Sequence, residues 1–185
     1  MTVEKPALRA DARRNRERVL AAAEAAFAVD GLAVPLDEIA RRAGVGAGTV
    51  YRHFPSKEAL FQAVVLDRIG QFSAEARELL EASDPGEAFF DYFTRVIGQV
   101  SRDKALCDAL AETTGSGFKA EAGDEFRDAL AKLLVRAQRA GAVRADIDPA
   151  DLRALVIGCV AVERNAPPGH HHLVGVVLDG LRVTH

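Results

Sequence analysis

The side chains with the clearest chemistry form a row between residues 41 and 57. They carry hydroxyl, imidazole, guanidinium and ammonium groups, all of which donate hydrogen bonds to phosphate oxygens. The row consists of Arg41, Arg42, Thr49, Tyr51, Arg52, His53 and Lys57. Donors of this kind, gathered in one short stretch, indicate contact with a nucleic-acid backbone.

Small residues stand at the centre of this row, at Gly46, Ala47, Gly48 and Thr49. Small side chains let the N-terminus of a helix approach DNA closely, and its free amides and positive partial charge favour phosphate. Ala47 and Thr49 come near the start of the predicted helix, closest to the base edges, where the Ala47 methyl can meet a thymine methyl. We therefore expect this helix to lie in a major groove.

Two short helices must position the row. The first is predicted by apolar residues at i, i+3, i+4 and i+7, namely Leu36, Ile39, Ala40 and Ala43. Pro35 is expected at its first position, and Gly44 accepts the positive φ of a tight turn after it. Val45 can fill the angle between the two helices. The second helix runs from about residue 46 to Phe54, because Pro55 prevents its continuation.

This stretch resembles the signature of the TetR family, roughly L-x-x-I-A-x-x-A-G-V-S-x-G-x-x-Y-x-H-F-x-x-K-E-x-L. The residues that match it in register are Leu36, Ile39, Ala40, Ala43, Gly44, Val45, Gly48, Tyr51, His53, Phe54, Lys57, Glu58 and Leu60. The match is dense over residues 13–65, and beyond them the resemblance rests on the helix count. One departure is Gly46, where Ser or Thr usually caps the recognition helix, although glycine is an acceptable N-cap.

The resemblance implies a homodimeric repressor that binds a palindromic double-stranded DNA operator and is released by a small molecule. It also places Tyr51, His53 and Lys57 at the family's phosphate contacts. The full set of residues expected at the DNA is Arg41, Arg42, Ala47, Gly48, Thr49, Tyr51, Arg52, His53 and Lys57. An activator, or a regulator without a ligand, is an alternative that the sequence leaves open.

The predicted fold class is all-α, because nearly every other segment also has a helical pattern. A first helix is expected over residues 13–28, ended by Gly31, and a long fourth helix after Ser56. We expect an N-terminal three-helix helix-turn-helix DNA-binding domain at residues 10–58. A C-terminal helical domain for ligand binding and dimerisation is expected at residues 59–185, with a short helix at 104–112 within it.

Aromatic residues of the second domain lie on either side of a polar stretch at 113–117. They are either core or, as the resemblance implies, part of a ligand pocket. The pocket residues expected are Phe89, Phe93, Leu110, Phe126 and Leu130, and the expected ligand is small and apolar or amphipathic. The last two helices are apolar on more than one face, which predicts a homodimer formed through them.

Composition and charge bound the remaining possibilities. Hydrophobic residues make up 49% and charged residues 28% of the chain, as in globular proteins. The net charge of −3 divides into +2 for residues 1–58 and −5 for the remainder, and a DNA-binding protein needs only a basic face. The arginines at positions 9 to 18 either form a solvated face or reach phosphate. No apolar leader or membrane-length run is present, so we expect a cytoplasmic protein with no membrane partner.

Other chemistries have little support in the sequence. Cys107 and Cys159 lie in apolar helical patterns, where cysteine acts as a small hydrophobe. The adjacent imidazoles of residues 170–172 point in different directions on a helix, so we expect no metal and no cofactor. An enzyme is disfavoured because no nucleophile–base pair, metal-ligand spacing or phosphate loop is visible. A protein-interaction module would not need the row of donors at residues 49–57.

Overall fold

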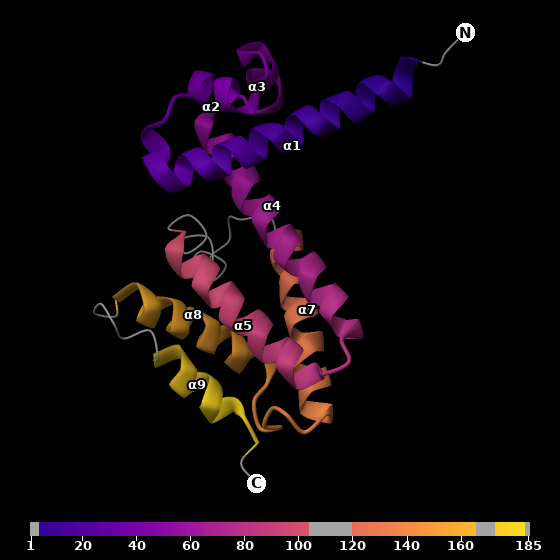
Figure 1. Ribbon diagram of the computed structural model, residues 1–185, viewed down its shortest axis with the longest axis vertical. Helices are drawn as coiled ribbons and strands as arrows, with labels where there is room; N and C mark the ends of the chain where they lie inside the picture. Colours follow the sequence, from indigo (N-terminus) through magenta and orange to yellow (C-terminus); the bar gives the residue numbers. More distant parts are fainter. Residues whose placement is uncertain (1–3, 104–119, 166–172, 184–185) are drawn as a thin grey trace. The chain divides into compact units, whose positions relative to one another are not determined.

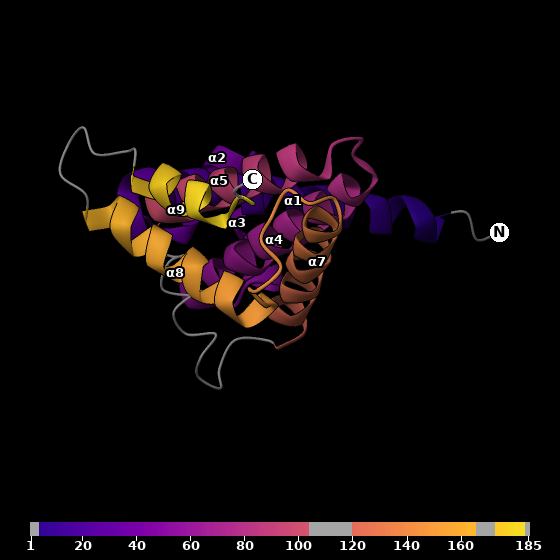
Figure 2. The same ribbon diagram turned by 90° about the horizontal axis from the view of Figure 1, so that it is seen from below.

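The structure, a computed structural model, describes residues 4–103, 120–165 and 173–183 (Figures 1 and 2). Within these residues the chain forms eight α-helices and no β-strand, which confirms the predicted all-α fold. The chain divides into two compact units, residues 1–68 (unit 1) and residues 69–185 (unit 2). The division falls inside one long helix, so this helix belongs to both units.

Unit 1 contains three helices and the first half of a fourth: α1 (Glu4–Asp30), α2 (Leu36–Ala43), α3 (Ala47–His53) and α4 (Lys57–Glu78), with a 3₁₀ turn, η1 (Gly31–Ala33), after α1. The helix α1 begins earlier than its apolar pattern predicts. Pro6 falls in its first turn, where a missing N–H is tolerated. Gly31, at φ +63°, ends the helix as expected.

The prediction that Pro35 is the first helical residue is wrong. Pro35 is the N-cap of α2, with an extended ψ of 149°. Its carbonyl accepts the Ile39 N–H at 3.2 Å, so the residue caps the helix through its backbone. Ser56 caps α4 in the predicted way, because its Oγ accepts the Ala59 N–H at 3.1 Å.

The core of unit 1 joins α1, α2 and α3 to the start of α4. Its apolar side chains come from all of these elements: Val19, Leu20, Ala23, Ala26, Val34, Leu36, Ile39, Ala40, Ala43, Val50, Phe54, Leu60 and Val64. Val45, between α2 and α3, is partly buried against this cluster, as its predicted place in the turn requires. Burial of one face of each short helix is what stabilises it, because helices of seven or eight residues are marginal alone.

Unit 2 is built around α5 (Pro85–Arg102), which packs against α7 (Ala120–Arg139) and α8 (Pro149–Asn165). The short helix α9 (Leu173–Leu181) packs on α8, and the two lie side by side in both views (Figures 1 and 2). The helix α4 ends in a 3₁₀ turn, η2 (Leu79–Glu81). Asp84 then caps α5 by accepting the N–H groups of Gly86 and Glu87 at 2.9 Å.

A buried hydrogen bond joins α5 to the second half of α4. The Tyr92 hydroxyl donates to the Phe72 carbonyl at 2.7 Å, and Tyr92 is fully buried. Burial raises the pKa of Tyr92 above its ordinary value, so this hydroxyl stays protonated and keeps donating. The bond fixes α5 against the stretch of α4 that lies in unit 2.

Several predictions from the sequence fall outside the described residues. They are the helix at 104–112, the polar stretch at 113–117, and the residues Leu110, Cys107, His170, His171 and His172. Among the described residues, Cys159 is buried as predicted, and no helix is long and apolar enough to cross a membrane. The same residues contain no cluster of three His, Cys, Asp or Glu side chains able to hold a metal.

Candidate nucleic-acid interface and ligand pocket

The turn between α2 and α3 depends on Gly44. This residue adopts the left-handed region, at φ 63° and ψ 37°, and its N–H caps α2. A guanidinium N–H of Arg18 in α1 donates to the Gly44 carbonyl at 3.2 Å. A Cβ atom at this position would lie 2.5 Å from the same Arg18 nitrogen. The backbone conformation therefore favours glycine, and an added Cβ would also displace the flexible end of the Arg18 side chain.

The helix α3 is attached to unit 1 by a single buried residue, Val50, which is fully inaccessible. Thr49 is half-buried, and the other residues of α3 are exposed: Ala47, Gly48, Tyr51, Arg52 and His53. A Cβ atom added at Gly46 or Gly48 would meet nothing within 4 Å. The N-terminal part of α3 is thus exposed, and no neighbouring atom of the described residues would prevent it from entering a DNA groove.

Tyr51 and His53, in the second half of α3, have free polar groups. Tyr51 is 49% exposed, and neither its hydroxyl nor the His53 imidazole has a hydrogen-bond partner among residues the structure describes. Arg52 turns back along α3, donating to the Gly48 carbonyl at 3.1 Å and to the Thr49 hydroxyl at 3.4 Å. The exposed end of α3 therefore offers a phenol and an imidazole to an incoming acceptor.

Arg41 and Arg42, at the end of α2, share the carboxylate of Glu38. Arg41 donates to both oxygens of Glu38 at 2.7 Å, and Arg42 donates to one at 2.8 Å. Arg42 also lies 2.9 Å from Asp30. The hydrogen bonds from Arg41 and Arg42 lower the pKa of Glu38 to about 2, so the carboxylate is charged at neutral pH. The network orients both guanidinium groups in the last turn of α2.

Lys57, the first residue of α4, is half-buried, and its Nζ donates to the Leu32 carbonyl in η1 at 2.8 Å. An ammonium group has three donors, so this bond orients the side chain and leaves others available. All nine residues predicted to meet DNA lie in unit 1, on α2, α3 or the start of α4.

Two residues that support this surface have roles that the sequence analysis did not assign. Arg18 donates a hydrogen bond to the turn at Gly44, and no sequence pattern links these two residues, which are 26 positions apart. Glu38 was detectable, since it precedes Arg41 and Arg42 by three and four residues, the spacing of helical ion pairs.

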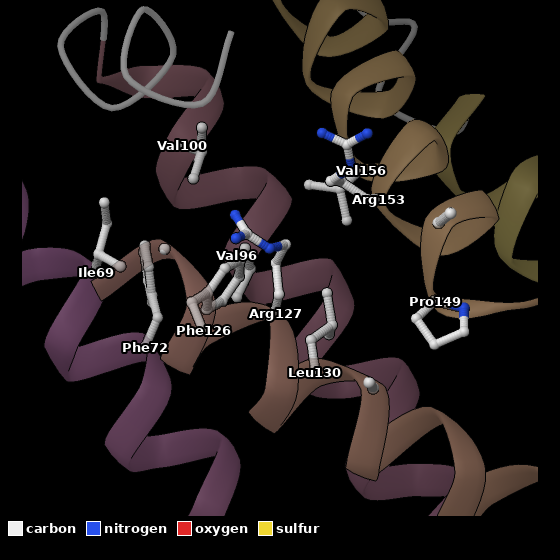
Figure 3. A pocket seen from close by; sticks show the side chains of 13 residues that line it. Ile69, Phe72, Val96, Val100, Phe126, Arg127, Leu130, Pro149, Arg153 and Val156 are labelled. Atoms are coloured by element: carbon white, nitrogen blue, oxygen red, sulfur yellow. The ribbon is translucent and has the colours of Figure 1, made fainter. Parts of the chain in front are cut away.

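A cavity of about 390 Å³ lies within unit 2 (Figure 3). Its walls come from α4, α5, α7 and α8: Ile69, Phe72, Val96, Val100, Gly123, Phe126, Arg127, Leu130, Ala131, Pro149, Ala150, Arg153 and Val156. Of the pocket residues predicted from the sequence, Phe126 and Leu130 line this cavity. Phe89 and Phe93 do not, and they stack in the core with ring centroids 5.9 Å apart.

Two family models match successive parts of the chain. Residues 19–64 match the model for bacterial regulatory proteins of the tetR family, and residues 84–183 match that for the C-terminal domain of SbtR-like transcriptional regulators. The first match contains α2 and α3 whole, and the second contains α5, α7, α8 and α9. The second covers more than half of the 185 residues.

Solved structures and curated proteins agree with these matches. The TetR transcription regulatory protein from Mycobacterium vanbaalenii is 47% identical, with a TM-score of 0.76 over 95% of this chain and 99% of that one. The TetR transcriptional regulator SCO0520 from Streptomyces coelicolor is 34% identical, with a TM-score of 0.73 over 92% and 99%. The HTH-type transcriptional regulator UidR from Escherichia coli is 32% identical over 97 residues, which are 52% of this chain and 47% of UidR. The chain thus spans about half the length of the curated relatives it matches.

Proposed function

Since the chain belongs to the TetR family of DNA-binding transcriptional regulators, we propose that it is a homodimeric repressor, released from a palindromic operator by a small ligand. The observation that carries the DNA-binding part is the exposure of α3, which buries only Val50 among its own residues and begins with residues too small to obstruct a groove. The proposal makes the chain a regulator of transcription and not an enzyme. It acts in the cytoplasm, where bacterial DNA lies.

The DNA contacts divide by chemistry. Ala47, Gly48 and Thr49, at the start of α3, face base edges in the major groove. The other six residues of the predicted set donate to phosphate or flank the groove: Arg41, Arg42, Tyr51, Arg52, His53 and Lys57. Phosphate contacts fix the position of α3, whereas base contacts decide which sequence is preferred. The bonds that already hold Arg41, Arg42 and Lys57 support this division, because they reduce the ordering needed on binding.

The proposed dimer forms through α8 and α9. Val162 is 36% exposed and Val176 is 63% exposed, although both lie on helices with an otherwise apolar character. A two-fold axis pairs the same patch on both chains, which buries these side chains. Two copies of α3, related by this axis, would then read the two halves of a palindrome.

The proposed ligand occupies the cavity of unit 2 and acts through α4. Leu60 and Val64 of this helix lie in the core of unit 1, and Ile69 and Phe72 line the cavity. A ligand that binds one position of α4 more tightly than the other shifts the population toward it. In the position that the ligand favours, the distance between the two copies of α3 would not match the spacing of the operator half-sites. The ligand and the operator then weaken each other's binding by the same factor.

The test begins with selection of bound sequences from random DNA. We expect a palindromic site with two half-sites about one helical turn apart, bound by two chains. Titration of this site by fluorescence anisotropy gives the affinity, and transcription from a promoter that contains it distinguishes repression from activation. Recovery of no preferred sequence would contradict the proposal, and increased transcription would replace the repressor by an activator.

A further inference from the structure

The cavity of unit 2 combines apolar walls with two guanidinium groups. Arg127 reaches it from α7 and Arg153 from α8 (Figure 3). The other lining residues carry no hydroxyl, amide or carboxyl side chain. Its volume of about 390 Å³ lies within the range of small-molecule sites. Among the residues that the structure describes, polar recognition by side chains in this cavity therefore depends on arginine, which favours a negatively charged ligand.

Arg153 is the guanidinium that is available. It is half-buried, and within the described part of the chain it makes no hydrogen bond or ion pair. A guanidinium presents two parallel N–H groups that match the two oxygens of a carboxylate. A neutral ligand that filled the cavity would cover this charge without pairing it, which costs free energy. A cationic ligand would be repelled by both arginines.

Arg127 is already partnered. It donates to Asp124, one turn earlier on α7, and the two side chains are 44% and 61% exposed. Exposed ion pairs of this kind are weak and exchange readily with solvent. Arg127 thus contributes positive charge at the cavity and can turn toward an anion. Among the described residues, however, the guanidinium without a partner is that of Arg153.

Backbone amides at the start of α8 cannot take the place of Arg153. Pro149 and Ala150 line the cavity at this end of the helix. However, the N–H groups of Ala150 and Asp151 donate to the Asp148 carboxylate at 2.7 and 2.9 Å. The N-cap of α8 is therefore satisfied within the protein, and at this end of the cavity an anion must be held by a side chain.

We propose that this cavity binds an amphipathic carboxylate, whose acid group pairs with Arg153 while its apolar body packs against Phe72, Phe126 and Leu130. The proposal rests on the ligand-responsive function proposed above and adds the chemical class of the ligand. A phosphate ester fits less well, because a dianion needs more donors than one open guanidinium provides. The carboxylate carries a single charge and leaves the rest of the molecule to the apolar walls.

The experiment compares head groups on one apolar chain, with the full-length protein and no DNA. Decanoate, decanol and decylamine, each below its micelle concentration or solubility limit, are titrated by calorimetry. The pair 4-phenylbutyrate and 4-phenylbutanol repeats the comparison on a ring. We expect each carboxylate to bind about tenfold or more tightly than its matched alcohol, as charge-assisted hydrogen bonds do. We expect the amine to bind more weakly than the alcohol.

Two variants assign the preference to Arg153. Arg153→Gln should bind decanoate no better than decanol and keep the wild-type affinity for decanol, which shows an intact cavity. Arg153→Lys keeps the positive charge but lacks the two parallel N–H donors, so it should keep part of the preference for decanoate over decanol. Arg164→Gln, on the exposed side of the same helix, should behave as wild type.

The proposal is overturned if neither carboxylate binds more tightly than its alcohol, or if Arg153→Gln retains the full preference. If Arg153→Gln also loses its affinity for decanol, the cavity is damaged in that variant and Arg153→Lys is used instead. A preference for decanoate over decanol in Arg153→Lys as large as that of wild type would contradict the bidentate pairing. Operator titration of the same preparations is a separate measurement. It can succeed when the head-group preference fails, so the two proposals fail independently.

Discussion

The proposed DNA surface of unit 1 and the cavity of unit 2 both contain arginine, and Arg153 of the cavity differs from the arginines of the surface in having no local partner. Arg41, Arg42 and Arg52 each donate to a partner three or four residues earlier on the same helix. Arg153 has no partner within the described residues, and its cavity has walls from four helices. On a surface that binds a repeating polyanion, local hydrogen bonds can orient the arginines before binding. In a site for a single anion, the guanidinium group is left unpaired until the anion binds.

The largest expected effect is on the free energy of unfolding, and it distinguishes the core of unit 2 from the wall of its cavity. Phe89 is fully buried between its neighbours on α5, whereas Phe126 is half-buried and faces the cavity. Phe89→Ala should lower the free energy of unfolding by about 3–5 kcal/mol. Phe126→Ala should lower it by only about 1 kcal/mol, because less of its area is buried. Urea denaturation of both variants makes the comparison, and equal losses would show that Phe126 belongs to the core.

A smaller effect is expected at the turn that places α3. Gly44→Ala should cost about 1–2 kcal/mol, because φ is +63° and Arg18 lies against the new Cβ. Gly48→Ala is the matched control. It should raise the stability by up to about 1 kcal/mol, since alanine favours helix and the added Cβ meets nothing.

The same pair separates stability from DNA binding. Gly48→Ala should weaken operator binding in spite of its greater stability, because the new methyl stands on the side of α3 that we propose to face the groove. Thermal unfolding and anisotropy titration measure the two quantities. Undiminished operator affinity in Gly48→Ala would remove Gly48 from the interface.

The smallest effect concerns the Glu38 network. Hydrogen bonds from Arg41 and Arg42 hold the folded pKa of Glu38 at about 2, below its ordinary value of 4.5. A depressed pKa stabilises the folded state above the unfolded pKa, and this contribution is lost as the pH falls toward 2. The stability difference between wild type and Glu38→Gln should therefore shrink as the pH is lowered from about 5 to 2. A difference that does not change with pH would show that the network is not formed in solution.

Local signals in the sequence predicted unit 1 well. Gly44 and Pro55 mark the ends of α2 and α3 by backbone chemistry that does not depend on distant residues. Pro35 was assigned one position too far into α2, because the same residue serves as N-cap or first helical residue and only ψ distinguishes them.

The cavity was harder to predict, because its lining is assembled from distant segments. Phe126 and Leu130 were predicted, but Phe89 and Phe93 have the same apolar spacing and belong to the core. Arg153 was not predicted, since one arginine on an apolar helix has no periodic signal. Which residue faces a cavity depends on how α4, α5, α7 and α8 pack, and helical periodicity gives only the face of each helix.

The central claim, that α3 and the start of α4 hold DNA, is tested most directly by the salt dependence of operator binding. Lys57→Ala should bind all sequences more weakly, with a slope of log affinity against log salt that is shallower by about one unit. Lys132→Ala, an exposed lysine on α7, is the control and should leave the slope unchanged. If Lys57→Ala binds the operator as tightly as wild type with an unchanged slope, and Tyr51→Phe and His53→Ala are also silent, this orientation of α3 on DNA is contradicted.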